Sequence, residues 1–354
     1  MKKIFTLAAL CCTLLTAHAD NETFKVCTYN IDGLPTSLDV MGVSIPIKKD
    51  GAGADGTKKI SEYFAGKDYD IIGVNEDFQY HNELMSSLSD KYNAGKWPGA
   101  IVVTATTIGD LLASIPFKVD GLNLLWKKDE IKAENETITP FTNAYGIIDS
   151  ENDSLVTKGF RYYKVTLKGG TEIDMYITHM DASVNLDDAE DIRVRRIQLK
   201  HIADSINANK NGRPIILMGD TNCNYEYDDV KGLLLDAINE KGEKTIYDVC
   251  TYLDPNGKDI WDKVFFINQK GGKQIKPLKY EIDETAKLSD HDPVVVTFEV
   301  TDPSTAIAEV TADSTSVDDI TAVYSLSGAR RQSLEPGINI VRLRDGRTVK
   351  VVKR

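Results

Sequence analysis

The sequence predicts an α/β protein that ends in a small all-β domain. Short apolar runs typical of buried strands alternate along most of the 354 residues with segments of helical periodicity. Several of the apolar runs end abruptly in a carboxylate, an amide or an imidazole. Residues 320–354 change to short β-prone runs separated by glycines, which are too few to build a large core.

The clearest strand lies at 214–222, where the sequence reads PIILMGDTN. The apolar run is short, begins with β-branched residues and follows a proline, so we expect a strand buried on both faces. It ends in Asp220 and Asn222, and their spacing predicts that both side chains lie on the same side of an extended backbone. Ligands of open α/β sheets bind outside the carboxyl ends of strands, so this strand end is the floor of a candidate active site.

The other elements are predicted from the same periodicities. The alternating runs at 160–167 and 172–179 are joined around two glycines, which predicts a hairpin. Residues 32–57 hold seven glycines and prolines and predict a loop. The helix at 186–207 is the strongest, because its isoleucines and leucine line one face. In chain order we expect strands at 24–30, 70–76, 121–126, 160–167, 172–179, 215–219, 260–267 and 294–300, and helices at 58–64, 81–88, 186–207 and 229–238.

Polar side chains at or beside the ends of these strands form the candidate site. Oxygen-rich clusters suit hard cations such as Mg²⁺, which one or two carboxylates usually hold together with water and substrate oxygens. The chain has no cysteine and histidine set at zinc spacing, no nucleophile elbow and no glycine-rich phosphate loop. We therefore expect metal-assisted hydrolysis by water, with a histidine as acid or base. The candidate residues are Asn30, Glu76, His179, Asp220, Asn222, Asp262, Asp290 and His291.

Six short motifs follow one another along the chain: TYN at 28–30, NE at 75–76, TH at 178–179, GDTN at 219–222, WDKV at 261–264 and SDHDP at 289–293. In order and rough spacing, the chain from Phe24 to Val300 resembles the endonuclease/exonuclease/phosphatase superfamily. That group includes DNase I, exonuclease III, bacterial sphingomyelinases and inositol polyphosphate 5-phosphatases. The resemblance implies an α/β (α+β) four-layer sandwich, in which two mixed β-sheets face each other with helices outside. It also implies a divalent-metal-dependent phosphoester hydrolase.

The resemblance further implies a metal site and a general base. Glu76 would be the principal ligand of Mg²⁺, or of Mn²⁺ as an alternative, with Asn30 and Asp290 near the metal. His291 would be the general base on the attacking water, and Asp262 would orient it.

Three further residues would act on the phosphate group. Asp220 would orient the water or stabilise the leaving group, and Asn222 and His179 would hydrogen-bond the phosphoryl oxygens. These roles suit phosphoryl transfer, which depends on positioning and on neutralising charge. Two positions depart from the family pattern. Asp181 could be a further ligand or part of a solvated turn, and Trp261 stands where the family has isoleucine or leucine.

The sequence leaves the substrate open. A phosphodiesterase acting on a nucleic acid or a phospholipid headgroup is favoured, although no match to the family's DNA-gripping residues is visible. A phosphomonoesterase on sugar or inositol phosphates would need a basic pocket, for which the arginines within 193–196 are the candidates. A binding protein that retains the fold is the third alternative. The apolar insert at 99–117 could touch a membrane surface transiently, while Asp110 favours a packed loop. We expect a monomer.

The first residues predict a signal peptide at 1–19. Two lysines precede an apolar stretch that ends in the small-residue motif AHA, and the stretch is too short to span a bilayer. We therefore expect export to the periplasm, the cell surface or the medium. Three cysteines remain after cleavage, and an odd count favours buried thiols over a disulfide framework. The net charge of −12 would repel a polyanion unless metal ions or a local basic patch offset it.

The domain boundaries follow from composition. Residues 20–300 form the expected catalytic domain, and small and polar residues predict a linker at 301–319. Residues 320–354, with VYSLSGARR, GINIVRL and the ending VKVVKR, resemble C-terminal β modules of exported Bacteroidetes proteins that serve in sorting. The alternative is a small accessory β domain.

Overall fold

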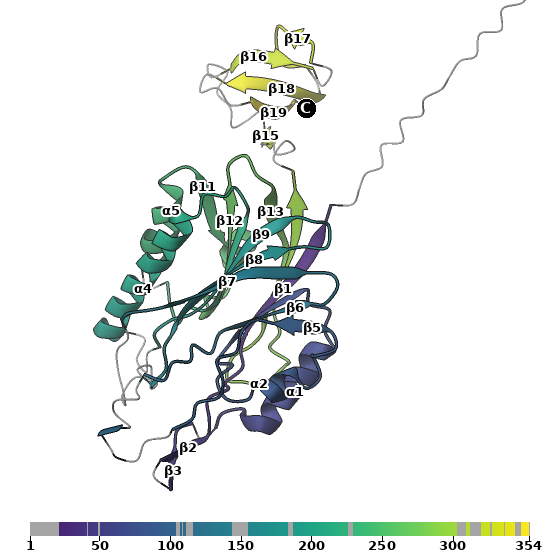
Figure 1. The fold of residues 1–354 in the computed structure, drawn as a ribbon. Helices are drawn as coiled ribbons and strands as arrows, with labels where there is room; N and C mark the ends of the chain where they lie inside the picture. Colours follow the sequence, from purple (N-terminus) through teal and green to yellow (C-terminus); the bar gives the residue numbers. More distant parts are fainter. Residues whose placement is uncertain are drawn as a thin grey trace, which may run out of the picture.

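The computed structural model describes residues 21–353 except 41, 49, 104–106, 108, 111–115, 144–154, 183–186, 226–228, 303–308, 312–319, 326–327, 336 and 344–347. The predicted signal segment at 1–19 lies outside the described residues, as does part of the insert at 99–117. In the part of the chain that is described, two six-stranded sheets form the body of the fold (Figure 1).

The first sheet is mixed and has the strand order β13-β14-β1-β4-β6-β5. β1 and β4 are parallel, and the other neighbours are antiparallel. Its strands are β1 (Thr23–Asn30), β4 (Ile71–Asn75), β5 (Tyr92–Ala94), β6 (Asn123–Lys127), β13 (Gln274–Ile282) and β14 (Val294–Thr301).

The second sheet is mixed as well, with the order β11-β12-β10-β9-β8-β7. β10 runs parallel to β9, and the remaining pairs are antiparallel. Its strands are β7 (Lys132–Pro140), β8 (Gly159–Thr166), β9 (Glu172–His179), β10 (Ile215–Asp220), β11 (Lys244–Asp248) and β12 (Asp262–Gln269).

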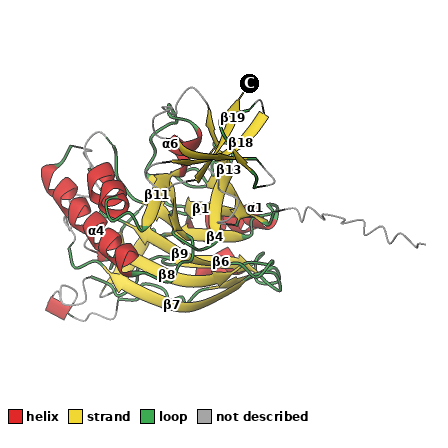
Figure 2. Ribbon diagram, turned by 90° about the horizontal axis from the view of Figure 1, so that it is seen from above, coloured by secondary structure: helices red, strands yellow, loops and turns green. Residues whose placement is uncertain are grey.

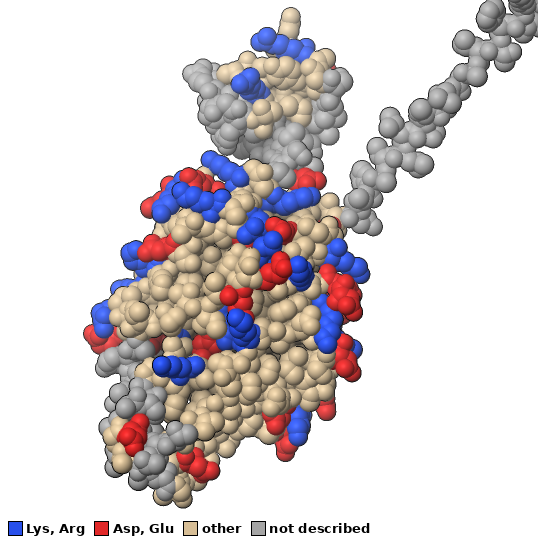
Figure 3. All heavy atoms as spheres, in the orientation of Figure 1, with Lys and Arg blue, Asp and Glu red and all other residues tan. Residues whose placement is uncertain are grey.

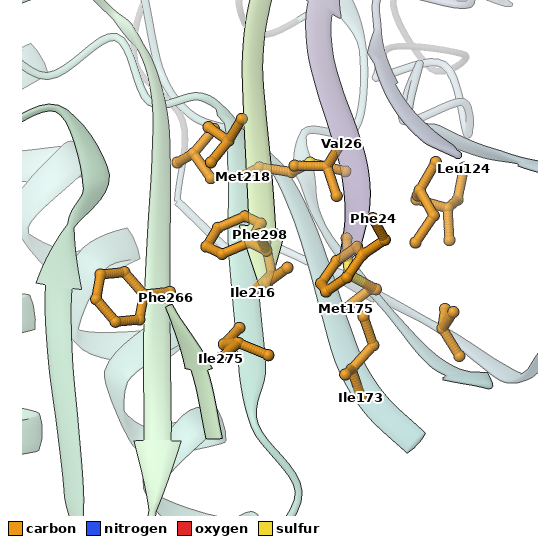
Figure 4. Close-up of a cluster of buried hydrophobic side chains, with 14 of the residues drawn as sticks. Phe24, Val26, Leu124, Ile173, Met175, Ile216, Met218, Phe266, Ile275 and Phe298 are labelled. Atoms are coloured by element: carbon orange, nitrogen blue, oxygen red, sulfur yellow. The ribbon is translucent and has the colours of Figure 1, made fainter. Parts of the chain in front are cut away.

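Side chains of the central strands alternate between two cores. On β10, Ile216 and Met218 belong to the core between the sheets, whereas Ile215 and Leu217 pack into the core under the helices. Figure 4 shows side chains from both sheets in the inter-sheet core, among them Met218 and Phe298. Both faces of β10 are therefore buried, which explains why its sequence is continuously apolar rather than alternating.

Helices form the two outer layers (Figure 2). Ile60 and Phe64 of α1 (Gly53–Ala65) and Leu84 of α2 (His81–Met85) pack against the first sheet. Leu199 and Ile202 of α4 (Ala189–Ala208) cover the second sheet, together with the π-helical turn η2 (Lys231–Asp236) and α5 (Ala237–Asn239). The predicted four-layer sandwich is confirmed, and strands make up more of it than helices.

Several elements differ from the sequence prediction. The stretch predicted as a loop at 32–57 contains a hairpin, β2 (Ser37–Val40) and β3 (Val43–Pro46), and α1 begins at Gly53 rather than at 58. The edge strands β7, β13, β5 and β11 escaped prediction. All nine positions of β7 are exposed or half-buried, so its sequence lacks the apolar alternation that marks a strand with one covered face.

The C-terminal residues form a separate five-stranded sheet with the order β15-β19-β18-β16-β17. β15 (Glu309–Thr311) pairs with β19 and lies inside 301–319, so the linker prediction is wrong for those three residues. Its other strands are β16 (Ile320–Tyr324), β17 (Arg330–Arg331), β18 (Gly337–Leu343) and β19 (Thr348–Lys353).

Two sequence-level properties can be followed on the molecule. Cys27, Cys223 and Cys250 are all buried free thiols, as predicted. On the face drawn in Figure 3, basic and acidic side chains are interspersed. Among the described residues, no helix combines the length and the apolar character needed to cross a bilayer.

Candidate active site

The strand register brings the predicted site residues to one edge of both sheets. Asp220 at the end of β10 lies opposite His179 on β9 and opposite Asp262 on β12. Asn30 at the end of β1 lies opposite Asn75 on β4, and Glu76 follows directly. Parallel strands end at the same edge, so residues far apart in sequence become neighbours.

Asn30 connects the two sheets at this edge. Its Nδ2 donates to Glu76 Oε1 at 3.0 Å and to Asp220 Oδ2 at 3.1 Å. Its Oδ1 accepts from the backbone N–H of Asp32 at 3.0 Å. One buried amide therefore fixes a carboxylate from each sheet in a single cluster.

His291 and Asp262 form a hydrogen-bonded pair beside this cluster. His291 Nδ1 lies 2.5 Å from Asp262 Oδ2, and His291 Nε2 lies 3.7 Å from Asp220 Oδ2. The loop that carries His291 is held to β1, because Ser289 Oγ donates to the carbonyl of Asn30 at 2.8 Å. Burial lowers the pKa of His291, but Asp262 and Asp220 outweigh it and hold this pKa well above its ordinary value.

The second histidine has the opposite electrostatic environment. His179 is buried, and its Nε2 lies 3.5 Å from Asp220 Oδ2. Burial and the nearby charge of Lys158 hold the pKa of His179 well below its ordinary value, so the ring is neutral. Burial raises the pKa of Asp220, but His291, His179 and Lys158 more than offset it, and this carboxyl stays ionised.

Glu76 is held in position by backbone geometry. Its φ is 63°, in the left-handed region, and a Cβ on Gly33 would lie only 2.2 Å from its carbonyl oxygen. Its Oε2 is buried and has no hydrogen-bond partner among the described residues. Burial raises the pKa of Glu76. A buried carboxylate oxygen without a partner is costly unless a cation or a solvent molecule satisfies it.

Gly219 allows β10 to approach β9 immediately before Asp220. Its φ is 140°, and a Cβ there would lie 2.0 Å from the carbonyl oxygen of Thr178. We expect Gly219→Ala to lower the free energy of unfolding by about 1–3 kcal/mol through backbone strain and this clash. Urea unfolding measures the change. Gly170→Ala is the control, because Gly170 has φ 86° but nothing within 4 Å of the added Cβ. Equal losses in the two variants would contradict the clash.

Lys48, Asp32 and Lys158 are charged residues at the site that the sequence did not predict. Lys48 Nζ lies 2.8 Å from Asp32 Oδ1 and 2.9 Å from Asp290 Oδ2. Lys158 is buried, and its Nζ donates to the carbonyl of Met180 at 2.8 Å. None of these residues belongs to a recognisable motif. Asp32 and Lys48 lie in the stretch predicted as a loop, and Lys158 immediately precedes β8.

Asn222 lies at the site, but not on an extended backbone. The strand ends at Asp220, and Asn222 has φ 49°, so the prediction based on strand alternation is wrong in its geometry. Asn222 N–H donates to Asp220 Oδ1 at 3.0 Å, and its Nδ2 donates to the Met180 carbonyl at 3.0 Å. The turn after β10 thus brings Asn222 back toward Asp220.

The two departures from the family pattern have different positions. Asp181 is fully buried and its backbone is tied to α4, with Gln198 Oε1 accepting from its N–H and Arg195 Nη1 donating to its carbonyl. A solvated turn is therefore wrong for Asp181. Trp261 is 43% exposed, and its ring centroid lies 5.9 Å from that of His291.

These residues surround one cavity of about 580 Å³. Its lining combines charged or polar residues, such as Glu76, Asp220 and His291, with apolar residues, such as Leu34 and Ile47. Every predicted site residue except Asp262 lines this cavity. Asp262 is hydrogen-bonded to His291, which does line it. The other lining residues are Pro46, Lys48, Asp50, Phe78, Leu155, Val156, Lys158, Ala182 and Trp261.

Two groups of side chains at the site could hold a cation. Asp220, Asp262 and His291 each offer a ligand atom, and these atoms lie within 4.8 Å of one another. His291 Nδ1 is already hydrogen-bonded to Asp262 Oδ2, so Nε2 is the nitrogen that could ligate a cation there. Glu76 Oε2, like Asp262 Oδ1, is buried without a hydrogen-bond partner among the described residues, and Glu76 lies beside Asn30. The group around Glu76 offers only oxygen donors, whereas the other group includes an imidazole nitrogen, so Glu76 and its neighbours fit a hard cation such as Mg²⁺ better.

Comparison with other sequences gives distant relatives. No family model matches the chain. Over 294 residues the chain is 26% identical to proteins named sphingomyelinase from Mycobacterium tuberculosis and Mycobacterium bovis. The match includes 78% of this chain and 52% of each relative, so the chain spans about half the length of the relatives it matches.

Comparison with solved structures gives neighbours that share the fold. TDP2 from D. rerio, in complex with a single-stranded DNA product, has a TM-score of 0.55 at 16% identity over 79% of this chain and 100% of that one. The human nocturnin catalytic domain with bound sulfate has a TM-score of 0.51 at 16% identity over 79% and 95%. A beta toxin variant from Staphylococcus aureus with bound magnesium ions has a TM-score of 0.50 at 18% identity over 78% and 99%.

Proposed function

We propose that this chain, which has the fold of the endonuclease/exonuclease/phosphatase superfamily, is a Mg²⁺-dependent phosphodiesterase that hydrolyses its substrate with water. One observation carries the proposal. Asn30 joins Glu76 and Asp220 at the floor of a cavity, directly beside the His291–Asp262 pair. A carboxylate with an unsatisfied oxygen and an oriented histidine thus face the same space.

The proposed metal ligands are Glu76, Asn30 and Asp290. When bound, Mg²⁺ would supply Lewis-acid stabilisation of charge on a phosphoryl oxygen. The Asp290 side chain is half exposed, so its carboxylate can bind a metal ion that enters from solvent.

His291 is the proposed general base. Asp262 accepts from Nδ1 and thereby fixes the ring, which leaves Nε2 facing Asp220 and the cavity. A water held between Nε2 and Asp220 would lose its proton to the imidazole as its oxygen attacks phosphorus. The P–O bond to the leaving group would break in the same step, and the departing alkoxide would take up a proton from solvent. Asp220 would orient this water and stabilise the imidazolium that forms.

His179, Asn222 and Lys158 are the proposed phosphate-binding residues. All three line the cavity: His179 ends β9, Asn222 follows β10 by two residues, and Lys158 immediately precedes β8. The low pKa of His179 keeps its ring neutral, so it can donate a hydrogen bond without repelling Lys158. Lys158 brings the buried positive charge that an anionic phosphoryl group requires.

A choline-type phospholipid such as sphingomyelin is the substrate we favour. The relatives detected by sequence are named sphingomyelinase, and the lining of the cavity includes apolar residues. The net charge of −12 opposes the long-range attraction of a nucleic acid. Arg193 and Arg195 do not support a phosphomonoesterase with a basic pocket. Arg195 is buried against Asp181, and Arg193 is paired with Glu190.

A substrate panel tests the proposal. We expect Mg²⁺-dependent release of phosphocholine from sphingomyelin in mixed micelles, abolished by EDTA and restored by excess Mg²⁺. Single-stranded DNA, bis-p-nitrophenyl phosphate and p-nitrophenyl phosphate complete the panel. Hydrolysis of DNA that falls steeply with salt would make the chain a nuclease instead. Hydrolysis of the monoester alone would favour a phosphomonoesterase, and no turnover of any substrate would favour a binding protein.

A further inference from the structure

Lys48 lies where a metal ion and an ammonium group would compete. It follows β3 by two residues, and its Nζ lies 2.8 Å from Asp32 Oδ1 and 2.9 Å from Asp290 Oδ2. The Lys48 side chain is 23% exposed and the Asp32 side chain only 4%. The pair is therefore shielded from most of the solvent screening that weakens surface ion pairs.

The anions that hold Lys48 are connected to the proposed metal ligands. Asp290 is itself one of them. Asp32 donates its backbone N–H to Asn30 Oδ1, and Asn30 Nδ2 donates to Glu76 Oε1. Lys48 thus lies at one end of a continuous chain of contacts that leads to Glu76, and both residues line the same cavity. Its positive charge partly neutralises the group of carboxylates that would attract a divalent cation.

We propose that Lys48 is a tethered cation that competes with the divalent metal for these carboxylates and so weakens metal binding. The inference rests on the proposed function, because it concerns the same metal site. An ammonium group is a compact point charge on a flexible four-carbon stem, which allows it to leave Asp290 when a metal arrives. Two cations close together in a partly buried site repel each other strongly, so one must be displaced or both are bound weakly.

The test is calorimetric titration of Mn²⁺ into the full chain without substrate. We expect Lys48→Met to bind Mn²⁺ at least about tenfold more tightly than the unmodified protein, which corresponds to about 1.4 kcal/mol. Lys48→Arg keeps the charge and should bind like the unmodified protein. If Lys48→Met binds Mn²⁺ equally or more weakly, Lys48 does not compete and the inference is wrong.

Lys127→Met is the matched control. Lys127 Nζ also bridges two carboxylates, those of Asp68 and Asp70, with an 18% exposed side chain. Asp70 immediately precedes β4, whereas Glu76 immediately follows it, so this pair lies at the opposite end of the strand. Mn²⁺ affinity should be unchanged in Lys127→Met. Tighter binding in this variant as well would mean that net charge alone explains the effect, and would overturn the inference.

Glu76→Gln separates this inference from the proposed function. If Mn²⁺ binding is lost in Glu76→Gln but unaltered in Lys48→Met, only the inference about Lys48 is contradicted, and the proposed metal site stands. If Glu76→Gln binds Mn²⁺ as tightly as the unmodified protein, the proposed metal site is wrong, and both proposals fail. Urea unfolding of each variant verifies that the protein titrated is folded.

Discussion

His291→Ala is expected to lower kcat/KM for the phosphodiester substrate by about 10²- to 10⁴-fold, the range typical of a lost general base. The imidazole is the basic group that is both oriented, by Asp262 at 2.5 Å, and directed at the cavity beside Asp220. Alanine removes the proton acceptor, while the proposed metal ligands and phosphate-binding residues remain. The loss should therefore fall on kcat more than on KM, as steady-state kinetics on the substrate identified by the panel can measure.

His201→Ala is the matched control for this experiment. His201 lies on α4 and packs against Phe160 with ring centroids 5.3 Å apart, in the core under the helices. Its folded variant should retain activity. A His291→Ala enzyme with unchanged kcat would rule out the assigned role.

The pH dependence of activity in Asp262→Asn tests the His291–Asp262 pair. Asp262 is the strongest of the charges that raise the pKa of His291. In the proposed mechanism the neutral imidazole of His291 is the base, so activity should rise with pH as His291 loses its proton. In Asp262→Asn the pKa of His291 should fall, and the acidic limb of the profile should shift to lower pH.

The sequence predicts that candidate residues at the ends of buried strands lie together, and the strand register places them at one sheet edge. Asp220 and His179 follow runs that are apolar enough to be recognised as buried strands, and such strands must end together at one sheet edge. The pairing of Asp262 with His291 depends on tertiary contact, which periodicity cannot predict. The resemblance to a known superfamily, through the order of its motifs, implied this pair.

The parts that escaped prediction share a physical cause. Lys48 and Asp32 lie in a stretch rich in glycine and proline, where the sequence gives no period from which a position in space could be inferred. Lys158 precedes β8, but a single lysine before a strand ordinarily faces solvent. In the structure Lys158 is buried and donates to the Met180 carbonyl, a tertiary contact that the sequence does not reveal. Edge strands such as β7 bury too little apolar surface to show a pattern.

Glu76→Gln is expected to lower kcat/KM by roughly a thousandfold, equivalent to the several kcal/mol that a metal ion contributes to transition-state stabilisation. The amide has nearly the same shape and can still accept a hydrogen bond from Asn30, so the cluster should keep its geometry. What disappears is the negative charge of a carboxylate whose Oε2 is buried without a partner among the described residues. Because burial of that charge is unfavourable without a cation, the same substitution should leave the metal-free protein equally or more stable.

These opposite effects on activity and stability distinguish a metal ligand from a structural glutamate. Activity is measured across a Mg²⁺ titration, and stability by urea unfolding in EDTA. Glu134→Gln on β7 provides the comparison, because Glu134 pairs with Lys132 at the surface and should change neither quantity by much. A Glu76→Gln protein that loses stability in EDTA would indicate that the carboxylate supports the fold rather than a cation. An activity that excess Mg²⁺ restores fully would mean that Glu76 tunes affinity without being required for the chemistry.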